Sequence, residues 1–168
     1  MKTVKILLVA LLMVGASSVF AQQKFAVVDA QTILMAMPEL DSVKVKVDKV
    51  QQELMEQMSA NEKEYTTKIQ DYQKNKDKYS ETIRAQKEKE LQSLTARIEE
   101  FQQVANKELQ DKNQEFMTPV QQKLIDAIKY VGKQNDFVFV FDKNAALYVS
   151  ETLVTDITSL VKAHLKLK

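Results

Sequence analysis

Apolar side chains recur every three or four residues through the middle of this 168-residue chain, and residues 39–118 contain neither glycine nor proline. The first apolar stripe advances in steps of 4, 3, 4, 4, 3, 4, 4, 3 and 4 residues, so nine steps cover 33 residues. Spacing close to an 11-residue repeat predicts helices that coil about a partner with little curvature. The stripe consists of Val43, Val47, Val50, Leu54, Met58, Asn61, Tyr65, Ile69, Tyr72 and Lys76.

A second stripe has the same spacing and one polar member, Lys112; it comprises Leu94, Ile98, Phe101, Ala105, Leu109, Lys112, Phe116 and Val120. Between the stripes, residues 73–82 (QKNKDKYSET) are polar apart from Tyr79 and offer turn and capping side chains. The spacing nevertheless continues in phase across them, so periodicity allows either one continuous helix or a hairpin. In a hairpin, each arm of about 40 residues would extend roughly 60 Å, and the stripes would face each other.

A short apolar segment, Phe25–Val28, precedes this helical section and predicts a β-strand. Asp29 then suits the N-cap of a short helix, because a carboxylate accepts the unpaired N–H groups of a first turn. The alternative role, a catalytic acid, lacks a paired carboxylate or a histidine nearby in the sequence. Pro38 predicts a break, since the residue before a proline is pushed out of helical conformation.

Pro119 fits either the first turn of a new helical segment or a kink. Residues 120–132 continue the apolar face and end at Gly132, which we expect to be a left-handed residue at the helix C-terminus. Two apolar runs, 137–141 and 145–149, are separated by three turn-forming residues and predict two strands joined by a tight turn. We expect both strands to share one sheet with the strand that begins at residue 25.

The last predicted element is an amphipathic helix over residues 156–165, capped by Asp156 or Thr155. It carries the only histidine of the chain, His164, for which we expect a surface or packing role. We predict no catalytic, metal-binding or cofactor-binding residues, because the chain has no cysteine and lacks paired ligand spacings and a glycine-rich phosphate loop.

The first 21 residues predict a secretory signal peptide that is cleaved after Ala21. Lys2 and Lys5 supply the positive start, an apolar run follows, and Val19 and Ala21 occupy the small-residue positions of a cleavage site. The apolar core is shorter than the ~20 residues that span a bilayer, which argues against an uncleaved anchor. We therefore expect export, to a bacterial periplasm.

Removal of Lys2 and Lys5 changes the charge balance from 24 basic and 23 acidic side chains to 22 and 23, a net charge of −1. A nucleic-acid-binding protein needs an excess of Lys and Arg to neutralise phosphates, so this class is excluded. The predicted organisation is a signal peptide (1–21), a β-rich body (22–38 and 119–168) and a coiled-coil arm (39–118).

Two blocks of sequence carry a resemblance: FAVVDAQTIL at 25–34 with Pro38 behind it, and TPVQQKLIDAIKYVGKQNDFVFVFD at 118–142, followed by LYV at 147 and DIT at 156. In this order behind a signal peptide, they resemble the Skp/OmpH family of periplasmic chaperones over essentially all of the mature chain. The resemblance implies an α+β, mainly α fold in which a small β-rich trimerisation body carries a long antiparallel helical hairpin with its tip near 73–82.

The same resemblance implies a homotrimer that holds unfolded outer-membrane β-barrel proteins in a cavity between its helical arms, without ATP. The two apolar stripes would pack against each other within the hairpin, which leaves few apolar residues to contact clients. We expect sparse and individually weak contacts, because one such side chain contributes at most ~1.5–3 kcal/mol. The candidates are Val45, Met55, Leu91, Val104 and Met117. An alternative is that Met55 and Met117 only edge the hairpin core.

The predicted tip is basic, although residues 39–118 as a whole hold 14 basic and 17 acidic side chains. Residues 74–89 contain Asp77, Glu81 and Glu88 against six basic residues: Lys74, Lys76, Lys78, Arg84, Lys87 and Lys89. The tip could steer anionic clients or make weak contact with anionic lipid headgroups. The alternative is a solvated helix end, since exposed charges are screened beyond ~8–10 Å at ordinary salt.

Two functions of different class are consistent with this sequence. We favour a holdase chaperone that is not an enzyme. The alternative is a structural coiled-coil spacer or assembly scaffold of the cell envelope.

Overall fold

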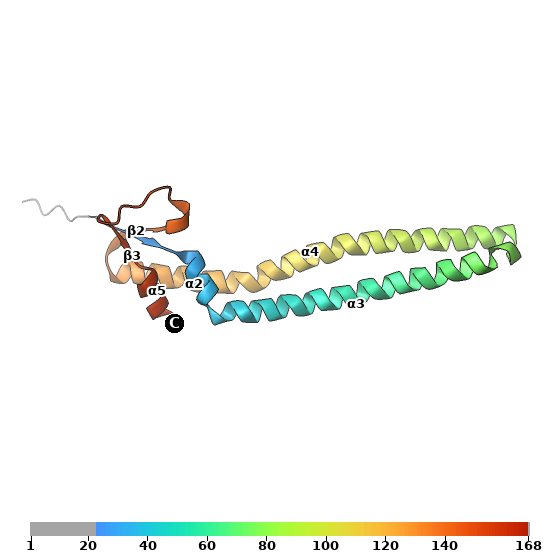
Figure 1. The fold of residues 1–168 in the computed structure, drawn as a ribbon, viewed down its shortest axis with the longest axis horizontal. Coiled ribbons are helices and arrows are strands. Elements are labelled where there is room, and N and C mark those ends of the chain that lie inside the picture. The colour runs from blue at the N-terminus through green and yellow to red at the C-terminus, as the bar shows by residue number, and fades with distance from the viewer. Residues whose placement is uncertain (1–22, 168) are drawn as a thin grey trace, which may run out of the picture.

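The computed structural model describes residues 23–167 as a long helical hairpin that projects from a small body of sheet and short helices (Figure 1). The predicted signal peptide lies outside the described residues. Along the chain the elements are β1 (Lys24–Val28), α2 (Ala30–Ala36), α3 (Pro38–Asn75), a 3₁₀ turn (Lys76–Lys78), α4 (Glu81–Gln134), β2 (Phe137–Asp142), a second 3₁₀ turn (Lys143–Ala145), β3 (Val154–Asp156) and α5 (Thr158–His164).

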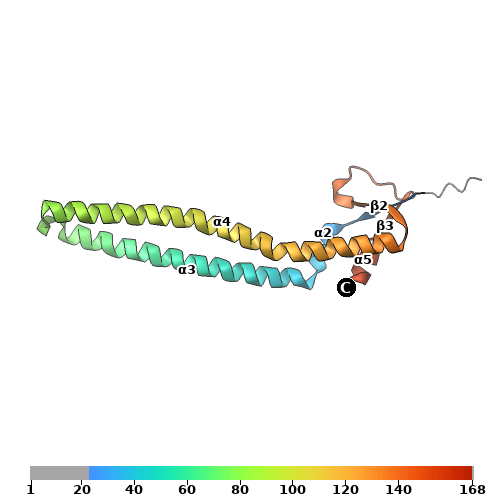
Figure 2. The same ribbon diagram turned by 180° about the vertical axis from the view of Figure 1, so that it is seen from behind.

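The chain forms a hairpin and not one continuous helix, and it reverses within residues 73–82. After the 3₁₀ turn, the Ser80 side chain accepts a hydrogen bond from the Ile83 N–H at 3.4 Å and so caps the start of α4. Helices α3 and α4 then lie side by side along the arm in both views (Figures 1 and 2). The 38 residues of α3 extend about 57 Å at 1.5 Å per residue.

The two predicted stripes are the surfaces that α3 and α4 turn toward each other. Every stripe position from Val43 to Tyr72, and every one from Leu94 to Val120, is buried or half-buried. Lys76 alone departs from the prediction, because it lies in the turn and is exposed.

The body contains a parallel three-stranded sheet in the order β2-β1-β3, with both ends of the chain contributing. Phe25 of β1 pairs with Phe139 on one side and with Val154 on the other. Beneath the sheet, Val28, Ile33, Val131 and Val161 share one core. Segments more than 100 residues apart in sequence therefore stabilise each other.

The predicted strand at 145–149 is wrong. Residues 143–145 form a 3₁₀ turn, no regular element follows up to residue 153, and the third strand is β3 at Val154–Asp156. Both outer strands run parallel to β1, and a parallel strand needs a crossover connection, which a tight turn cannot provide. The apolar side chains of this connection, Leu147 and Tyr148, are exposed.

The expected left-handed cap at Gly132 is also wrong, because α4 continues to Gln134 and the residue with positive φ is Asp136, at 58°. Gly132 is buried, and a Cβ atom there would lie 3.2 Å from Cγ2 of Val140. The glycine thus allows β2 to pack closely on α4. It serves packing, not helix termination.

The two prolines have different outcomes. Pro38 is the first residue of α3, directly after the break at Met37, as predicted. Pro119 lies inside α4, so the new segment that we considered does not exist. Figure 2 shows α4 curving in its yellow-to-orange stretch, where it leaves the arm for the body.

The predicted N-cap of α2 is confirmed, and that of α5 is confirmed in part. Asp29 caps α2 as predicted, since its carboxylate accepts from the Thr32 N–H at 2.9 Å. Helix α5 starts later than predicted, with Ile157 at the N-cap position. Asp156 still accepts a hydrogen bond from the Thr158 N–H at 2.9 Å, whereas Thr155 takes no capping position.

Candidate client-binding arm

Polar contacts join the two helices in the distal half of the arm. Lys68 pairs with Glu90, Arg97 pairs with Glu64, and the Tyr72 hydroxyl donates to Glu88. The hydrogen bond from Lys68 holds the pKa of Glu90 below its ordinary value, and the bond to Glu88 raises the pKa of Tyr72. The two helices of the distal arm are therefore joined by exposed and half-buried charged and polar groups as well as by the apolar stripes.

The half of the arm nearer the body is held differently. A pair between Lys123 and Glu39 closes its base, and the hydrogen bond from Lys123 lowers the pKa of Glu39. Between this pair and the Arg97–Glu64 pair, no ion pair in the described part of the arm joins α3 to α4. Over this stretch the helices are connected by apolar contacts and by Lys46, whose Nζ lies 5.5 Å from the centroid of the Phe116 ring.

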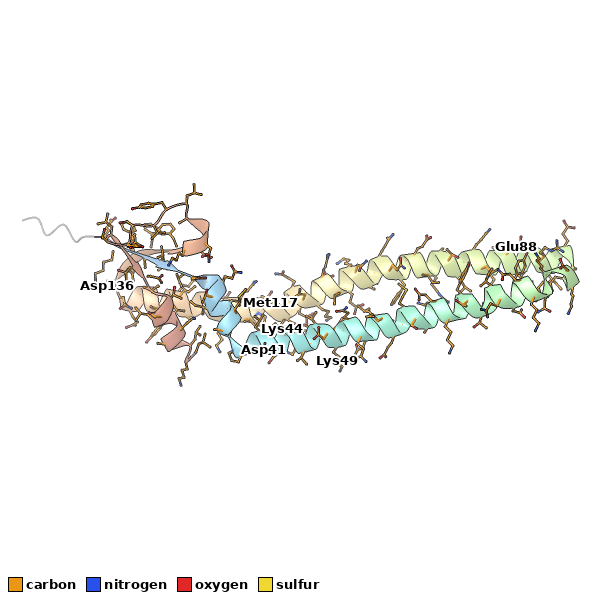
Figure 3. The ribbon with its side chains drawn as sticks, viewed as in Figure 1. Asp41, Lys44, Lys49, Glu88, Met117 and Asp136 are labelled. Carbon is orange, nitrogen blue, oxygen red and sulfur yellow. The ribbon has the colours of Figure 1, made fainter. Side chains whose placement is uncertain are left out.

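The five candidate client contacts differ in where their side chains lie. Val45, Met55 and Val104 are 68%, 63% and 52% exposed, so they are accessible. Leu91 is only 9% exposed because it continues the α4 stripe in phase with Leu94, and its expected accessibility is wrong. Met117 is half-buried and packs against the body core, at the place where the arm meets the body (Figure 3).

A hollow of about 300 Å³ opens between α3 and α4 in the apolar stretch. Ala105 lies in its wall, between the stripe residues Phe101 and Leu109, and Met55 lies on its α3 side. The pattern of apolar and polar positions does not predict this hollow. The available signal was a single small residue in a stripe of large ones.

The six basic residues of the predicted tip lie at and near the reversal of the chain. Lys74, Lys76, Lys78, Arg84 and Lys89 are exposed, whereas Lys87 is half-buried with its Nζ 3.9 Å from Glu90. An acidic residue, Glu88, lies among them near the end of the arm (Figure 3). Five of the six basic side chains are therefore open to solvent.

The body exposes large apolar side chains on the outer face of its sheet. Phe139 stacks between Phe25, at 6.2 Å, and Phe141, at 5.9 Å, measured between ring centroids. Phe139, Phe141 and Tyr148 are each more than half exposed. Apolar surface gathered in this way commonly marks an interaction site.

The residues considered for catalysis have structural roles. The His164 ring stacks on Tyr130 of α4 with centroids 4.3 Å apart, which fits a packing role. Asp29 accepts from Thr32 and Asn144, and the bond from the Thr32 backbone is the main cause of its lowered pKa. Among residues 23–167, no group of three or more His, Cys, Asp or Glu side chains could hold a metal ion.

A comparison with protein-family models matches residues 24–165 to the family described as "Outer membrane protein (OmpH-like)". The chain belongs to the OmpH-like family. Its fold is similar to the crystal structure of a candidate OmpH-like outer membrane chaperone from Caulobacter crescentus CB15, with a TM-score of 0.72 and 16% identity. This match covers 85% of the present chain and 83% of the other. No curated protein matches.

The OmpH-like match spans both sequence blocks that carried the resemblance, and the similar fold confirms the predicted α+β, mainly α architecture. Within residues 23–167, no helix combines the length and apolar content needed to cross a bilayer.

Proposed function

We propose that this OmpH-like protein is an ATP-independent holdase chaperone, which binds unfolded outer-membrane β-barrel proteins between its helical arms and prevents their aggregation. The family match over residues 24–165 carries this proposal. The free projection of the arm supports it, because α3 and α4 leave the body and contact only each other over most of their length (Figure 1). In this proposal the protein acts in the periplasm after its signal peptide is cleaved, and it catalyses no reaction.

The working unit in this proposal is a homotrimer built through the bodies. The exposed Phe139, Phe141 and Tyr148 supply an apolar face that association would cover. The arm stripes are already used between α3 and α4, so they do not compete for this role. Three arms held at one end would enclose a space beside the bodies.

In this proposal each residue contributes little binding free energy, and affinity for the client comes from many such contacts together. Val45, Met55 and Val104 are exposed and apolar, and burying each one contributes at most ~1.5–3 kcal/mol. Met suits such a surface because its side chain is flexible and polarizable. Contacts repeated on three arms raise the overall affinity through effective concentration.

The basic tip plays a smaller part. Its exposed lysines would steer anionic segments of clients, with at most weak contact to anionic lipids, because Glu88 and Glu81 lie among them. We assign no nucleic-acid partner to it, since the mature chain has a net charge of −1.

Aggregation of an unfolded β-barrel protein diluted from urea tests the holdase. We expect near-stoichiometric protein, counted as trimer, to suppress light scattering by the client without ATP. No suppression would refute the holdase and favour the envelope spacer or scaffold. Mass from multi-angle light scattering tests the trimer separately, and a monomer at micromolar concentration would contradict it.

A further inference from the structure

The hollow in the arm has an apolar floor. Leu54 and Met58 of α3 and Phe101 and Leu109 of α4 line it, and all four remain half-buried although they belong to the stripes. At Ala105 a single methyl group stands where the neighbouring stripe residues are large, so the two helices leave the space between them unfilled. Its volume, about 300 Å³, is at the small end of ligand pockets and suits one or two side chains.

The rim of the hollow is made of amides. Gln51, Gln102 and Asn106 line it, and none of them takes part in a side-chain hydrogen bond with another group of residues 23–167, whereas the neighbouring Gln52 donates to Glu56 at 3.0 Å. No charged residue lines the hollow, although 14 basic and 17 acidic residues fall within the 80 residues of the arm. A carboxamide both donates and accepts, as a peptide group does.

We propose that this hollow is a subsite for an extended, unfolded segment of a client, which places one large apolar side chain on the floor and its backbone against the amides. The inference rests on the proposed function and names the site. A folded partner has paired its backbone groups within its own secondary structure, whereas an unfolded segment still offers N–H and C=O groups. An uncharged lining fits uncharged peptide and apolar groups.

A neighbouring hollow gives the direction in which the segment runs. This second hollow, about 480 Å³, shares Gln51 and Met55 with the first, extends over α3 to Gln52 and Ser59, and unlike the first carries two carboxylates at its edge, Asp48 and Glu56. In an extended chain, side chains two residues apart lie on the same side, about 6.6–6.8 Å apart. Met55 lines both hollows, so a segment held in the first hollow can continue over this exposed methionine onto α3.

The test fills the floor of the hollow with Ala105→Leu in the full chain. The matched control is Ala96→Leu, which makes the same change at an exposed position of the same helix. The probe is a fluorescently labelled outer-membrane β-barrel protein diluted from urea, and its affinity is read by anisotropy. We expect Ala105→Leu to weaken binding at least fivefold with an unchanged circular dichroism spectrum, and Ala96→Leu to bind as the parent does.

Methyl NMR of methionines gives a local readout that does not depend on a variant. Upon addition of the probe we expect the Met55 and Met58 signals to shift, while the signal of Met37, buried in the body, stays in place. Unshifted Met55 and Met58 signals, or equal affinity for Ala105→Leu and the parent, would overturn the subsite and leave the holdase intact. A change in mass with Ala105→Leu would mark the hollow as a contact between copies, which also overturns it. Failure of the parent to bind the probe would refute the proposed function itself.

Discussion

Replacement of Ile33 by alanine tests how the body holds its N-terminal helix. Ile33 is fully buried and is the one buried residue of α2, a helix of seven residues. So short a helix is unstable alone, and its packing must supply its stability. Removing a buried isoleucine side chain down to Cβ costs about 2–5 kcal/mol, through lost transfer energy and the cavity left behind. For a chain of this size, about 3 kcal/mol corresponds to a melting temperature lower by roughly 6–12 °C.

The measurement is urea unfolding followed by far-ultraviolet circular dichroism, with Met35→Ala as the control. Met35 lies on the same helix and is 66% exposed, so its truncation should change the free energy of unfolding by less than about 0.5 kcal/mol. Equal losses for the two variants, or a loss below about 1 kcal/mol for Ile33→Ala, would refute the reasoning. Such a result would mean that α2 contributes little to the body in solution.

Three further predictions concern charge and packing. The folded pKa of Asp29 is lowered, so the Asp29 carboxylate stabilises the fold above its unfolded pKa of about 4, and this contribution is lost as the pH falls through the folded pKa. The urea midpoints of the parent and Asp29→Asn should therefore converge below pH 4. A gap between the midpoints that stays constant with pH would contradict this. Gly132→Leu should destabilise by roughly 1–3 kcal/mol through its clash with Val140, whereas Gly132→Ala should lie within about 1 kcal/mol of the parent, because helix propensity offsets the close contact. Lys68→Gln should barely change thermal stability in 1 M salt, where the exposed pair with Glu90 is screened, and a larger loss there than at low salt would count against this assignment.

The arm could be predicted from sequence because one rule governs it. Each helix packs one face on one neighbour, so the positions that are buried recur at the helical period. Val43 and Val120, the ends of the two stripes, are both buried as predicted. Periodicity alone does not distinguish the hairpin from one continuous helix, because the spacing continues in phase across residues 73–82 and does not record a reversal.

The body was predicted less well because its partners are distant in sequence. The apolar composition of residues 145–149 indicates a strand, but a strand also needs a free edge of the sheet to pair with. The second edge of β1 pairs with β3 and not with residues 145–149. Gly132 was assigned to a helix end by its residue type, while Val140, eight residues further on, determines why glycine is needed there. Contacts between elements determined both outcomes.

In the arm, too, contacts between helices decide features of the candidate site that the sequence pattern does not record. Leu91 is buried because the α4 stripe, extended backwards from Leu94, passes through it, and a stripe that is started at Leu94 does not include it. The hollow forms because the Ala105 side chain is too small to fill the space between α4 and the facing side chains of α3. A pattern of apolar and polar positions does not distinguish alanine from leucine.

The distribution of apolar surface suggests how association and client binding can coexist in one chain. On the body, large aromatic side chains such as Phe139 and Phe141 lie together and more than half exposed, so association there buries a continuous face. On the arm, Val45, Met55 and Val104 are exposed at positions well separated in the sequence, so two arms that touch gain little. In the proposed trimer, copies would therefore join at their bodies and keep their arms separate. An extended client, which reaches several arms at once, gains from the scattered sites that two rigid arms cannot use together.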